Sequence, residues 1–586
     1  MAFLSSLPTF ARTVRQLRLS QIAWQAVHVA RVQANNHVPA LGICRMHPDP
    51  KARPAPLPAL EIPGIDPRPA ELWQQGMVEY HGISAARHDW KGEGQSKLWR
   101  YERQYHTELV ALAATSIEDA RALIDDWIAS NPPCRGDAWE PYPVARRLLN
   151  WSLAGAIAPP LRPHLSPWMA TQMRFLARRL ERHLLGNHLL CDLCALVAAA
   201  ATLECDDSAI VGERAACRLE RELERQVLPD GGYAERTAQY HLIVLQDALL
   251  ALVLHRARGR TLATDVILAR MLGWVEKIRR RDGSFPCLND AVPSSSPSID
   301  TIHGLAKLAG LSLPGNPPAA VTELPDTGWT MARVGAHELL FEHGEIGPKE
   351  QPGHGHADAL SFELVWDGVP VVTDTGVTTY APGEIRTFER SAAAHAAVSV
   401  DGQGADEIWA SFRVGGRGRP MYLGTSSPWP GAWLLRGQVE SYRGWTHQRS
   451  LLFWPNQLLV VRDDLLHVPE RAQVLSNLPL DPAWRVADLA EGGGALESAT
   501  AGLRLVVLAG RAISAVRGEY PSRPGWVGRG FGAAEGRVSV RLQPDERGRL
   551  VYALVAPQVR LCFAAGELRI DADSVSQRLT LPEPSP

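Results

Sequence analysis

The sequence predicts an α+β multidomain protein, with an N-terminal (α/α) toroid followed by a C-terminal antiparallel β-sandwich. Three observations lead to this prediction. From Glu71 to about Leu311, apolar residues recur with the helical period between short turns. Two of the expected helices are apolar nearly all round, as helices buried among other helices are. After the segment 311–320 the period becomes alternating and stays so to the end, which is typical of strands.

The helical half is expected to consist of serial helical hairpins. Because alternate helices are apolar enough to be buried, an (α/α) toroid is favoured, and a solenoid-like stack is the alternative. The two helices apolar nearly all round are 188–203 and 234–257. The helix candidates are 97–115, 117–130, 140–157, 167–185, 188–203, 208–227, 234–257 and 263–280.

The second half contains many short strands separated by turns, which implies an antiparallel sandwich. Asp367-Gly368 stands between two of the strands and is a typical hairpin turn. Strand candidates include 339–342, 361–366, 369–373, 433–439, 449–453, 458–462, 503–508, 538–542, 550–555 and 568–570.

Three parts of the chain are expected. Residues 1–70 hold a basic amphipathic helix candidate at 12–33 and a Pro-rich connector. Residues 71–315 form the toroid, and residues 325–586 form the antiparallel β-sandwich.

Composition limits the possible partners. A formal net charge of −2 and a pI near 6.8 give no basic field of the kind that drives nucleic-acid binding, so no nucleic-acid partner is expected. No run of about eighteen or more apolar residues occurs, so no membrane span is expected. There is no clear signal peptide, which makes the cytoplasm the default expectation and the bacterial periplasm the alternative.

The densest group of candidate ligands and bases lies at the start of the β-rich half. His354, His356 and Asp358 are spaced by two, so on a strand all three would face one side. The hairpin can carry Asp374 back beside His356, and His395 follows. Imidazole binds metals and moves protons near neutral pH, and a carboxylate completes a metal sphere or fixes the tautomer. The group is therefore a candidate metal and base site, although nineteen histidines make some close pairs expected by chance.

Polar side chains stand where the two apolar helices begin. Asn187 and His188 open the first, and Tyr240 and His241 stand near the start of the second. Asn187 alone is explained by helix capping, and Tyr240 alone by packing. A phenol can nevertheless act as an acid or base if nearby cations or imidazoles lower its cost of ionisation. The combination indicates a second candidate catalytic group.

Together these motifs resemble the heparinase II/III-like polysaccharide lyases and the related alginate and glycosaminoglycan lyases, which are built as an α/α toroid plus an antiparallel β-sandwich. The resemblance covers about residues 70–570. One departure is Ala396, which stands where the family usually has Asn after the histidine equivalent to His395. The matching segments are 99–103, 139–151, 187–188, the segment around Tyr240, 353–358, 371–376 and 390–395.

The resemblance implies β-elimination on an acidic polysaccharide, giving unsaturated uronides. Candidate substrates are glycosaminoglycans such as hyaluronan, chondroitin sulfate and heparan sulfate, with alginate as a further candidate. Asn187, assisted by His188, would neutralise the uronate carboxylate. Tyr240 would take the C5 proton, return a proton to the departing O4, or do both. His354 would be the alternative base on the opposite face of the sugar.

The resemblance also implies a metal and a set of sugar contacts. One divalent ion, Zn²⁺ or Mn²⁺, would be held by His356, Asp374 and His395, mainly as a structural element. Guanidinium groups suit carboxylates and sulfates, and indoles stack on sugars; for these residues interhelix packing is the alternative. The residues expected to contact substrate are Trp99, Arg103, Trp139, Arg147, His241 and Arg390.

Two other functions fit the same motifs. A metal-dependent polysaccharide hydrolase would use the ion to activate water. A non-catalytic polysaccharide-binding protein would use the same scaffold without cleaving its ligand. The residues do not distinguish endo from exo action or fix the oligomeric state.

Overall fold

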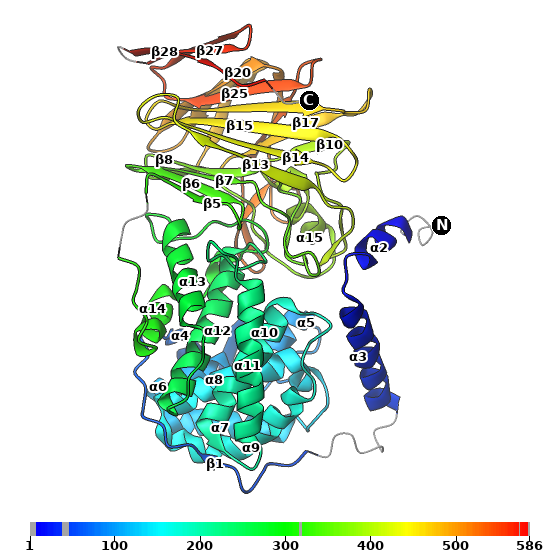
Figure 1. Cartoon of the computed structure of the whole chain (residues 1–586), viewed down its shortest axis with the longest axis vertical. Coiled ribbons are helices and arrows are strands. Elements are labelled where there is room, and N and C mark those ends of the chain that lie inside the picture. The colour runs from blue at the N-terminus through cyan, green and yellow to red at the C-terminus, as the bar shows by residue number, and fades with distance from the viewer. Residues whose placement is uncertain (1–6, 38–45, 316–318, 573–574, 584–586) are drawn as a thin grey trace.

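The helical half and the β-sheets lie end to end along the long axis of the molecule (Figure 1). The computed structural model describes residues 7–37, 46–315, 319–572 and 575–583. A helical N-terminal region is followed by a strand-rich region of antiparallel sheets. The fold class predicted from the sequence is confirmed.

The helical half is organised around helices whose surfaces are apolar on nearly all sides. α10 (Gly186–Thr202) and α12 (Ala238–Ala257) are buried along almost their whole length, as expected for helices enclosed by other helices. α10 packs against α8 (Pro141–Ile157), α11 (Ser208–Gln226) and α12. The other helices of this half are α4 (Arg68–Gln74), α5 (Lys97–Glu102), α6 (Thr107–Thr115), α7 (Ile117–Ser130), α9 (Arg162–Ala177), α13 (Asp265–Ile278) and α14 (Ile299–Leu308).

Two predicted helices of this half differ most from the structure. The candidate 97–115 is split into α5 and α6, because His106 adopts a left-handed conformation with φ of 59° at the start of α6. The candidate 167–185 is α9, which already starts at Arg162 and ends at Ala177. Pro163 lies in the first turn of α9, where backbone N–H groups have no partner within the helix, so proline loses no hydrogen bond there.

One helix is long and apolar enough to cross a membrane by length and composition, among the residues described. This helix is α12, and 89% of its most apolar window is buried inside the protein. α12 is thus explained as the core helix of the helical half.

The β-rich half stacks antiparallel sheets above the helices. The five-stranded sheet next to the helices has the order β5 (Val321–Leu324), β6 (Trp329–Val334), β7 (His337–Glu342), β8 (Phe362–Trp366) and β9 (Val369–Val372). β8 and β9 form the predicted hairpin, and Asp367 and Gly368 both have positive φ, as a two-residue turn of this kind requires.

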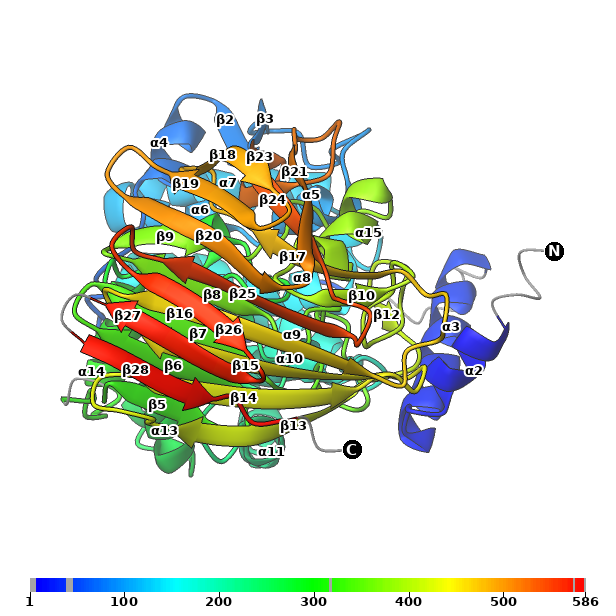
Figure 2. The same ribbon diagram turned by 90° about the horizontal axis from the view of Figure 1, so that it is seen from above.

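Three further sheets of three or more strands belong to this half (Figure 2). The eight-stranded sheet has the order β13 (Arg419–Ser426), β14 (Trp433–Glu440), β15 (Thr446–Trp454), β16 (Leu458–Leu466), β25 (Arg549–Val555), β20 (Gly502–Ala509), β19 (Gly493–Glu497) and β18 (Arg485–Ala490). The four-stranded sheet has the order β10 (Val398–Val400), β17 (Val474–Pro479), β24 (Val538–Gln543) and β21 (Arg511–Arg517). The three-stranded sheet is β26 (Arg560–Ala564), β27 (Glu567–Ala572) and β28 (Val575–Thr580).

The loops that follow the first sheet return to the helical half. A short helix, α15 (Glu384–Glu389), lies in the connection between β9 and β10, at the level where sheets and helices meet (Figure 1). This connection and the loop between β7 and β8 place side chains of the β-rich half beside the N-terminal end of α12.

Candidate functional site

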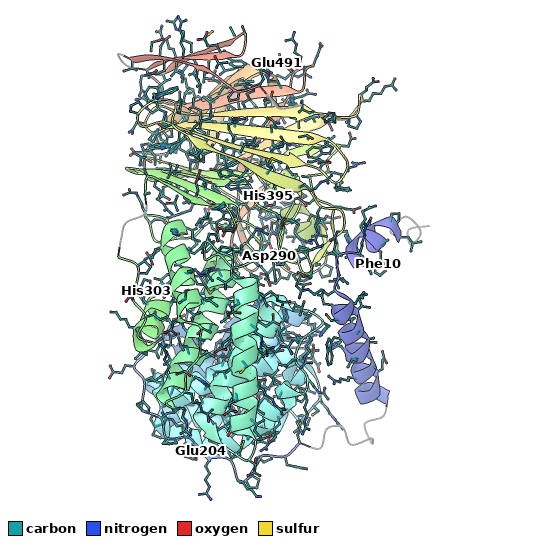
Figure 3. All side chains as sticks on the ribbon, viewed as in Figure 1. Phe10, Glu204, Asp290, His303, His395 and Glu491 are labelled. Carbon is teal, nitrogen blue, oxygen red and sulfur yellow. The ribbon has the colours of Figure 1, made fainter. Side chains whose placement is uncertain are left out.

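The candidate site lies at the junction of the two halves, where Figure 3 labels Asp290 and His395. Tyr240 comes from the first turn of α12, and Asp290 from the loop after α13. His354 and His356 come from the loop between β7 and β8. All these side chains are buried or nearly so.

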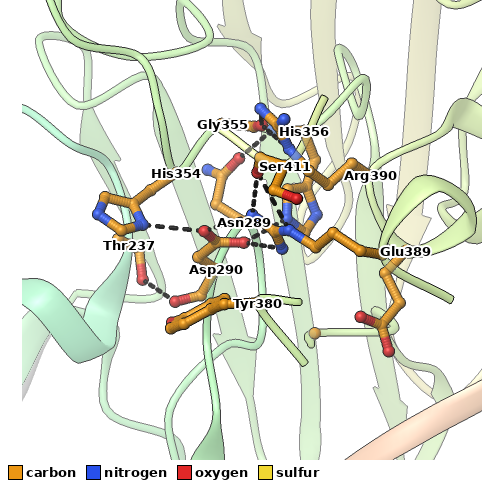
Figure 4. A network of polar contacts seen from close by, with 12 residues as sticks. Thr237, Asn289, Asp290, His354, Gly355, His356, Tyr380, Glu389, Arg390 and Ser411 are labelled. Atoms are coloured by element: carbon orange, nitrogen blue, oxygen red, sulfur yellow. Dashed lines mark hydrogen bonds and ion pairs between the residues drawn. The ribbon is translucent and has the colours of Figure 1, made fainter. Parts of the chain in front are cut away.

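Asp290 is the centre of a buried polar network (Figure 4). One carboxylate oxygen lies 2.9 Å from Nδ1 of His354, and the other lies 2.8 Å from Nε2 of His356. Arg386 of α15 donates to both oxygens, at 2.5 and 2.7 Å. A single carboxylate therefore fixes both histidines of the predicted motif.

Electrostatics define which atom of each ring carries a proton. Burial raises the pKa of Asp290, but Arg386 and the two imidazoles outweigh it and hold that pKa well below its ordinary value. Burial lowers the pKa of His356 to about 3, so this ring is neutral. An ionised carboxylate only accepts hydrogen bonds, so Nδ1 of His354 and Nε2 of His356 are the donors. When His354 is neutral, its Nε2 carries the free lone pair.

Tyr240 packs on His354, with ring centroids 3.9 Å apart. Its hydroxyl donates to the hydroxyl of Tyr380 at 3.2 Å. Burial, followed by the nearby Tyr380 and Asp290, raises the pKa of Tyr240 well above its ordinary value. The hypothesis that neighbours ease ionisation of this phenol is therefore wrong for the protein without substrate, in which Tyr240 holds its proton.

Asn187 adjoins the same group through Glu235, and His188 follows it in the first turn of α10. The Asn187 backbone N–H donates to Oε1 of Glu235 at 3.0 Å, and Oε2 of Glu235 lies 3.5 Å from Nε2 of His354. Asn187 does not cap α10, which begins one residue earlier. Nδ1 of His188 lies 3.0 Å from Glu181; burial lowers the pKa of His188, but the charge and hydrogen bond of Glu181 prevail and raise it. The structure thus brings all four predicted catalytic residues to one junction.

The histidine motif lies in a loop, so the prediction that a strand aligns His354, His356 and Asp358 on one face is wrong. The loop backbone passes too close to its neighbour for a side chain at Gly355, where a Cβ would lie 2.1 Å from the carbonyl oxygen of Ile346. The two histidines still converge, because both bind Asp290.

The three predicted metal ligands are neighbours. The rings of His356 and His395 are 5.2 Å apart between centroids, and Nδ1 of His395 lies 2.6 Å from Asp374. Within the described ranges, no group of three His, Cys, Asp or Glu side chains is arranged to hold a metal ion.

The donor chemistry of this cluster nevertheless suits a metal. Because Asp290 and Asp374 occupy one nitrogen of each ring, Nδ1 of His356 and Nε2 of His395 remain, and both are buried without a hydrogen-bond partner among the described residues. A carboxylate on one ring nitrogen with the other left free is the usual arrangement of a metal-binding histidine.

Five residues expected to contact sugar lie inside the helical half instead. Arg147 donates to Gln172 at 2.6 Å and to two backbone carbonyls at 2.9 and 3.0 Å. The guanidinium of Arg103 lies 3.3 Å from the ring centroid of Trp90. This placement supports the alternative of interhelix packing. The five residues, each at most 4% exposed, are Trp99, Arg103, Trp139, Arg147 and His241.

Arg390, the sixth expected contact, is fully buried and supports the histidine loop. It donates to the carbonyl of Gly355 at 2.7 and 3.2 Å and to the carbonyl of Ala410 at 2.9 Å. The arginine that acts on the side chains of the site is Arg386, four residues earlier.

Sequence reasoning missed Asp290, Arg386, Glu235 and Tyr380. Asp290 lies 64 residues before His354 and 96 before Arg386, in a segment without a period. The only local signal was an acidic residue among apolar neighbours, Leu288, Ala291 and Val292. Such a residue is buried only when paired, so it merited a search for partners.

Two family models match the chain. Residues 123–308 match the heparinase II/III N-terminus, and residues 316–548 match the heparinase II/III-like C-terminal domain. Together the two matches cover more than half of the sequence. No significant match to a curated protein is found.

Solved structures share the fold at low sequence identity. The crystal structure of a heparinase III superposes with a TM-score of 0.67 at 16% identity, covering 86% of each chain. The heparan sulfate lyase HepC from Pedobacter heparinus superposes with a TM-score of 0.57 at 17% identity, covering 89% of this chain and 90% of that chain.

Proposed function

Because the chain belongs to the heparinase II/III-like family of polysaccharide lyases, we propose that it cleaves a uronic-acid-containing glycosaminoglycan by β-elimination. The family resemblance seen in the sequence is confirmed. One observation carries the proposal: Tyr240 of the helical half and His354 of the β-rich half are in ring contact at 3.9 Å. A phenol from one half and an imidazole from the other thus lie side by side at the junction.

Asn187 and His188 would bind the uronate carboxylate. The C5 proton leaves only if the charge that develops on the carboxylate is stabilised in the transition state. The Asn187 side-chain amide makes no hydrogen bond to another described residue, so it is available as a donor. The raised pKa of His188 favours the imidazolium, whose positive charge offsets the developing negative charge.

His354 and Tyr240 would move the protons. Asp290 holds Nδ1 of His354 as the donor, which leaves Nε2 as the atom able to take the C5 proton. Tyr240 keeps its proton because its pKa is raised, so it is suited to protonate the departing O4. In this proposal His354 is the base, which was the alternative expected from the sequence, and Tyr240 is the acid.

We expect heparan sulfate to be the first substrate to test, because HepC, which shares the fold, is a heparan sulfate lyase. Hyaluronan, chondroitin sulfate and alginate are the comparison substrates. With His354 as the base and Tyr240 as the acid, one face of the sugar is served, so substrates with glucuronate and with iduronate belong in the panel to show which C5 epimer reacts.

A divalent ion, Zn²⁺ or Mn²⁺, would be held by His356, Asp374 and His395. Nδ1 of His356 and Nε2 of His395 are buried without a hydrogen-bond partner among the described residues, which supports this assignment. The ion would supply a cross-link between the loop before β8 and the connection after β9, which holds His354 in place.

The test is to incubate the protein with each polysaccharide and record ultraviolet absorbance. A lyase leaves a C4–C5 double bond conjugated with the carboxylate, which absorbs. A hydrolase would release reducing ends without that absorbance, and a binding protein would release neither. Tyr240→Phe and Asn187→Ala are expected to abolish turnover with the fold intact, and full activity in both would refute the assignment.

A further inference from the structure

The N-terminal helix pair, α2 (Leu7–Val14) and α3 (Leu19–His37), has no part in the chemistry above. Figures 1 and 2 both show it at the edge of the molecule, beside the junction of the two halves. The prediction of a single basic amphipathic helix at 12–33 is wrong, because a turn at 15–18 divides the segment into α2 and α3. The proposed reaction does not use either helix.

The face of the pair that meets the protein is mainly polar, and its aromatic member, Trp24, lies 4.6 Å from the guanidinium of Arg182. On α2, Thr9 and Arg12 both bind the carboxylate of Glu407, at 2.8 and 2.7 Å. On α3, residues 21, 24, 28 and 31 lie on one side of the helix. His28 stacks on His183 at 4.2 Å, and Arg31 donates to the carbonyl of Arg178 at 3.1 Å.

The opposite face is apolar and faces solvent. Of the fifteen large apolar side chains that are exposed among the described residues, six belong to these two short helices. Between them stand exposed alanines at 23, 26 and 30 and no charged residue from 19 to 30. This is the reverse of an ordinary surface helix, which turns its apolar side inward. The six residues are Leu7 (45%), Phe10 (56%), Leu19 (85%), Ile22 (41%), Val27 (38%) and Val29 (46%).

The charge of the segment has one sign. The sequence contains five Arg and no Lys, Asp or Glu before Asp49. Arg12 and Arg18 form ion pairs with Glu407 and Glu350. Arg15, in the turn between the two helices, is exposed. Arginine beside an apolar helical face is the composition that binds the interface of an anionic membrane.

We propose that the outward face of the N-terminal helix pair docks on an anionic lipid surface, with the helices lying in the plane of the interface. The inward polar contacts hold both helices with their apolar side outward, so the surface is already formed. The arginines would also attract nucleic acid, but binding to phosphates does not require an exposed apolar helix face. The docking does not depend on the proposed reaction.

Vesicle co-sedimentation of the full chain tests this. We expect binding to vesicles of phosphatidylcholine with phosphatidylglycerol, weaker binding to phosphatidylcholine alone, and loss of binding as salt is raised. The variant Phe10→Ser/Ile22→Ser/Val29→Ser should bind anionic vesicles at least ~10-fold more weakly, because three apolar side chains no longer enter the interface.

The control replaces three exposed apolar residues elsewhere, Ile210→Ser/Val266→Ser/Met421→Ser, which are on the whole more exposed, at 53%, 75% and 56%. This control should bind vesicles as the unaltered chain does. The proposal is overturned if the unaltered chain stays in solution, or if the outward-face variant binds as well as the control. It is also overturned if the outward-face variant only converts a dimer to a monomer in light scattering, since the face is then covered by a second copy.

Discussion

Asp290→Asn is the most informative substitution, because the Asp290 carboxylate binds His354, His356 and Arg386. It removes the negative charge between His354, His356 and Arg386 and keeps the shape of the side chain. The Arg386 side chain is 1% exposed and would retain the carbonyl of Ser411, at 3.0 and 3.2 Å, and at most the single amide oxygen of the new asparagine, both uncharged.

We estimate the loss of stability first and the loss of activity second. Removing one partner of a buried ion pair costs about 3–5 kcal/mol, because the remaining charge stays buried and uncompensated. An amide can also donate to Nδ1 of His354, which would place the proton on Nε2, the atom expected to act as base. Loss of a positioned base lowers kcat roughly 10²–10⁴-fold.

The assays are denaturant unfolding and the ultraviolet rate on a glycosaminoglycan. Asp282→Asn is the control, because this exposed carboxylate of the preceding turn binds only Ser284 and should change stability by less than ~0.5 kcal/mol. Adding Arg386→Met to Asp290→Asn should recover part of the lost stability, since both charges are then gone. If Asp290→Asn unfolds like the control and keeps a kcat near that of the unaltered chain, the reasoning is refuted.

Three further predictions follow from the same contacts. Arg390→Met should lower the thermal midpoint and kcat with little change in KM, because Arg390 supports the histidine loop; a raised KM at unchanged stability would instead indicate sugar contact. Glu181→Gln should destabilise the protein near pH 6 and progressively less at higher pH. Glu181 raises the pKa of His188 in the folded protein, so its effect on stability is fully present below the unfolded pKa of about 6.5 and is lost as the pH rises through the folded pKa. Unfolding midpoints across pH check this, and a gap that widens with pH would contradict it. His356→Ala should lower metal content and the thermal midpoint together, and normal metal stoichiometry would count against these ligands.

The sequence was informative wherever structure depends on nearby residues. α12 was predicted because its burial shows in an apolar composition around the whole helix. The turn between β8 and β9 was predicted because Asp-Gly accepts positive φ. The break between α5 and α6 at His106 was not predicted, since nothing in the neighbouring residues distinguishes a left-handed conformation there from a helical one.

The site was predictable only in part, because its central contacts join distant segments. Spacing by two suggested a strand for His354 and His356, whereas the structure has a loop there, whose backbone approaches Ile346 closely at Gly355. Tyr240 was a candidate catalytic residue because it lies near the start of a helix predicted to be buried. No pattern connects Asp290 or Arg386 to these residues, since the fold alone brings them together.

The most direct test of the account is a crystal structure of Tyr240→Phe bound to a glycosaminoglycan oligosaccharide. We expect the uronate carboxylate against the Asn187 amide and His188, with C5 facing Nε2 of His354 and O4 facing the ring of residue 240. A uronate bound away from this junction, or one whose C5 faces neither His354 nor residue 240, would contradict the account.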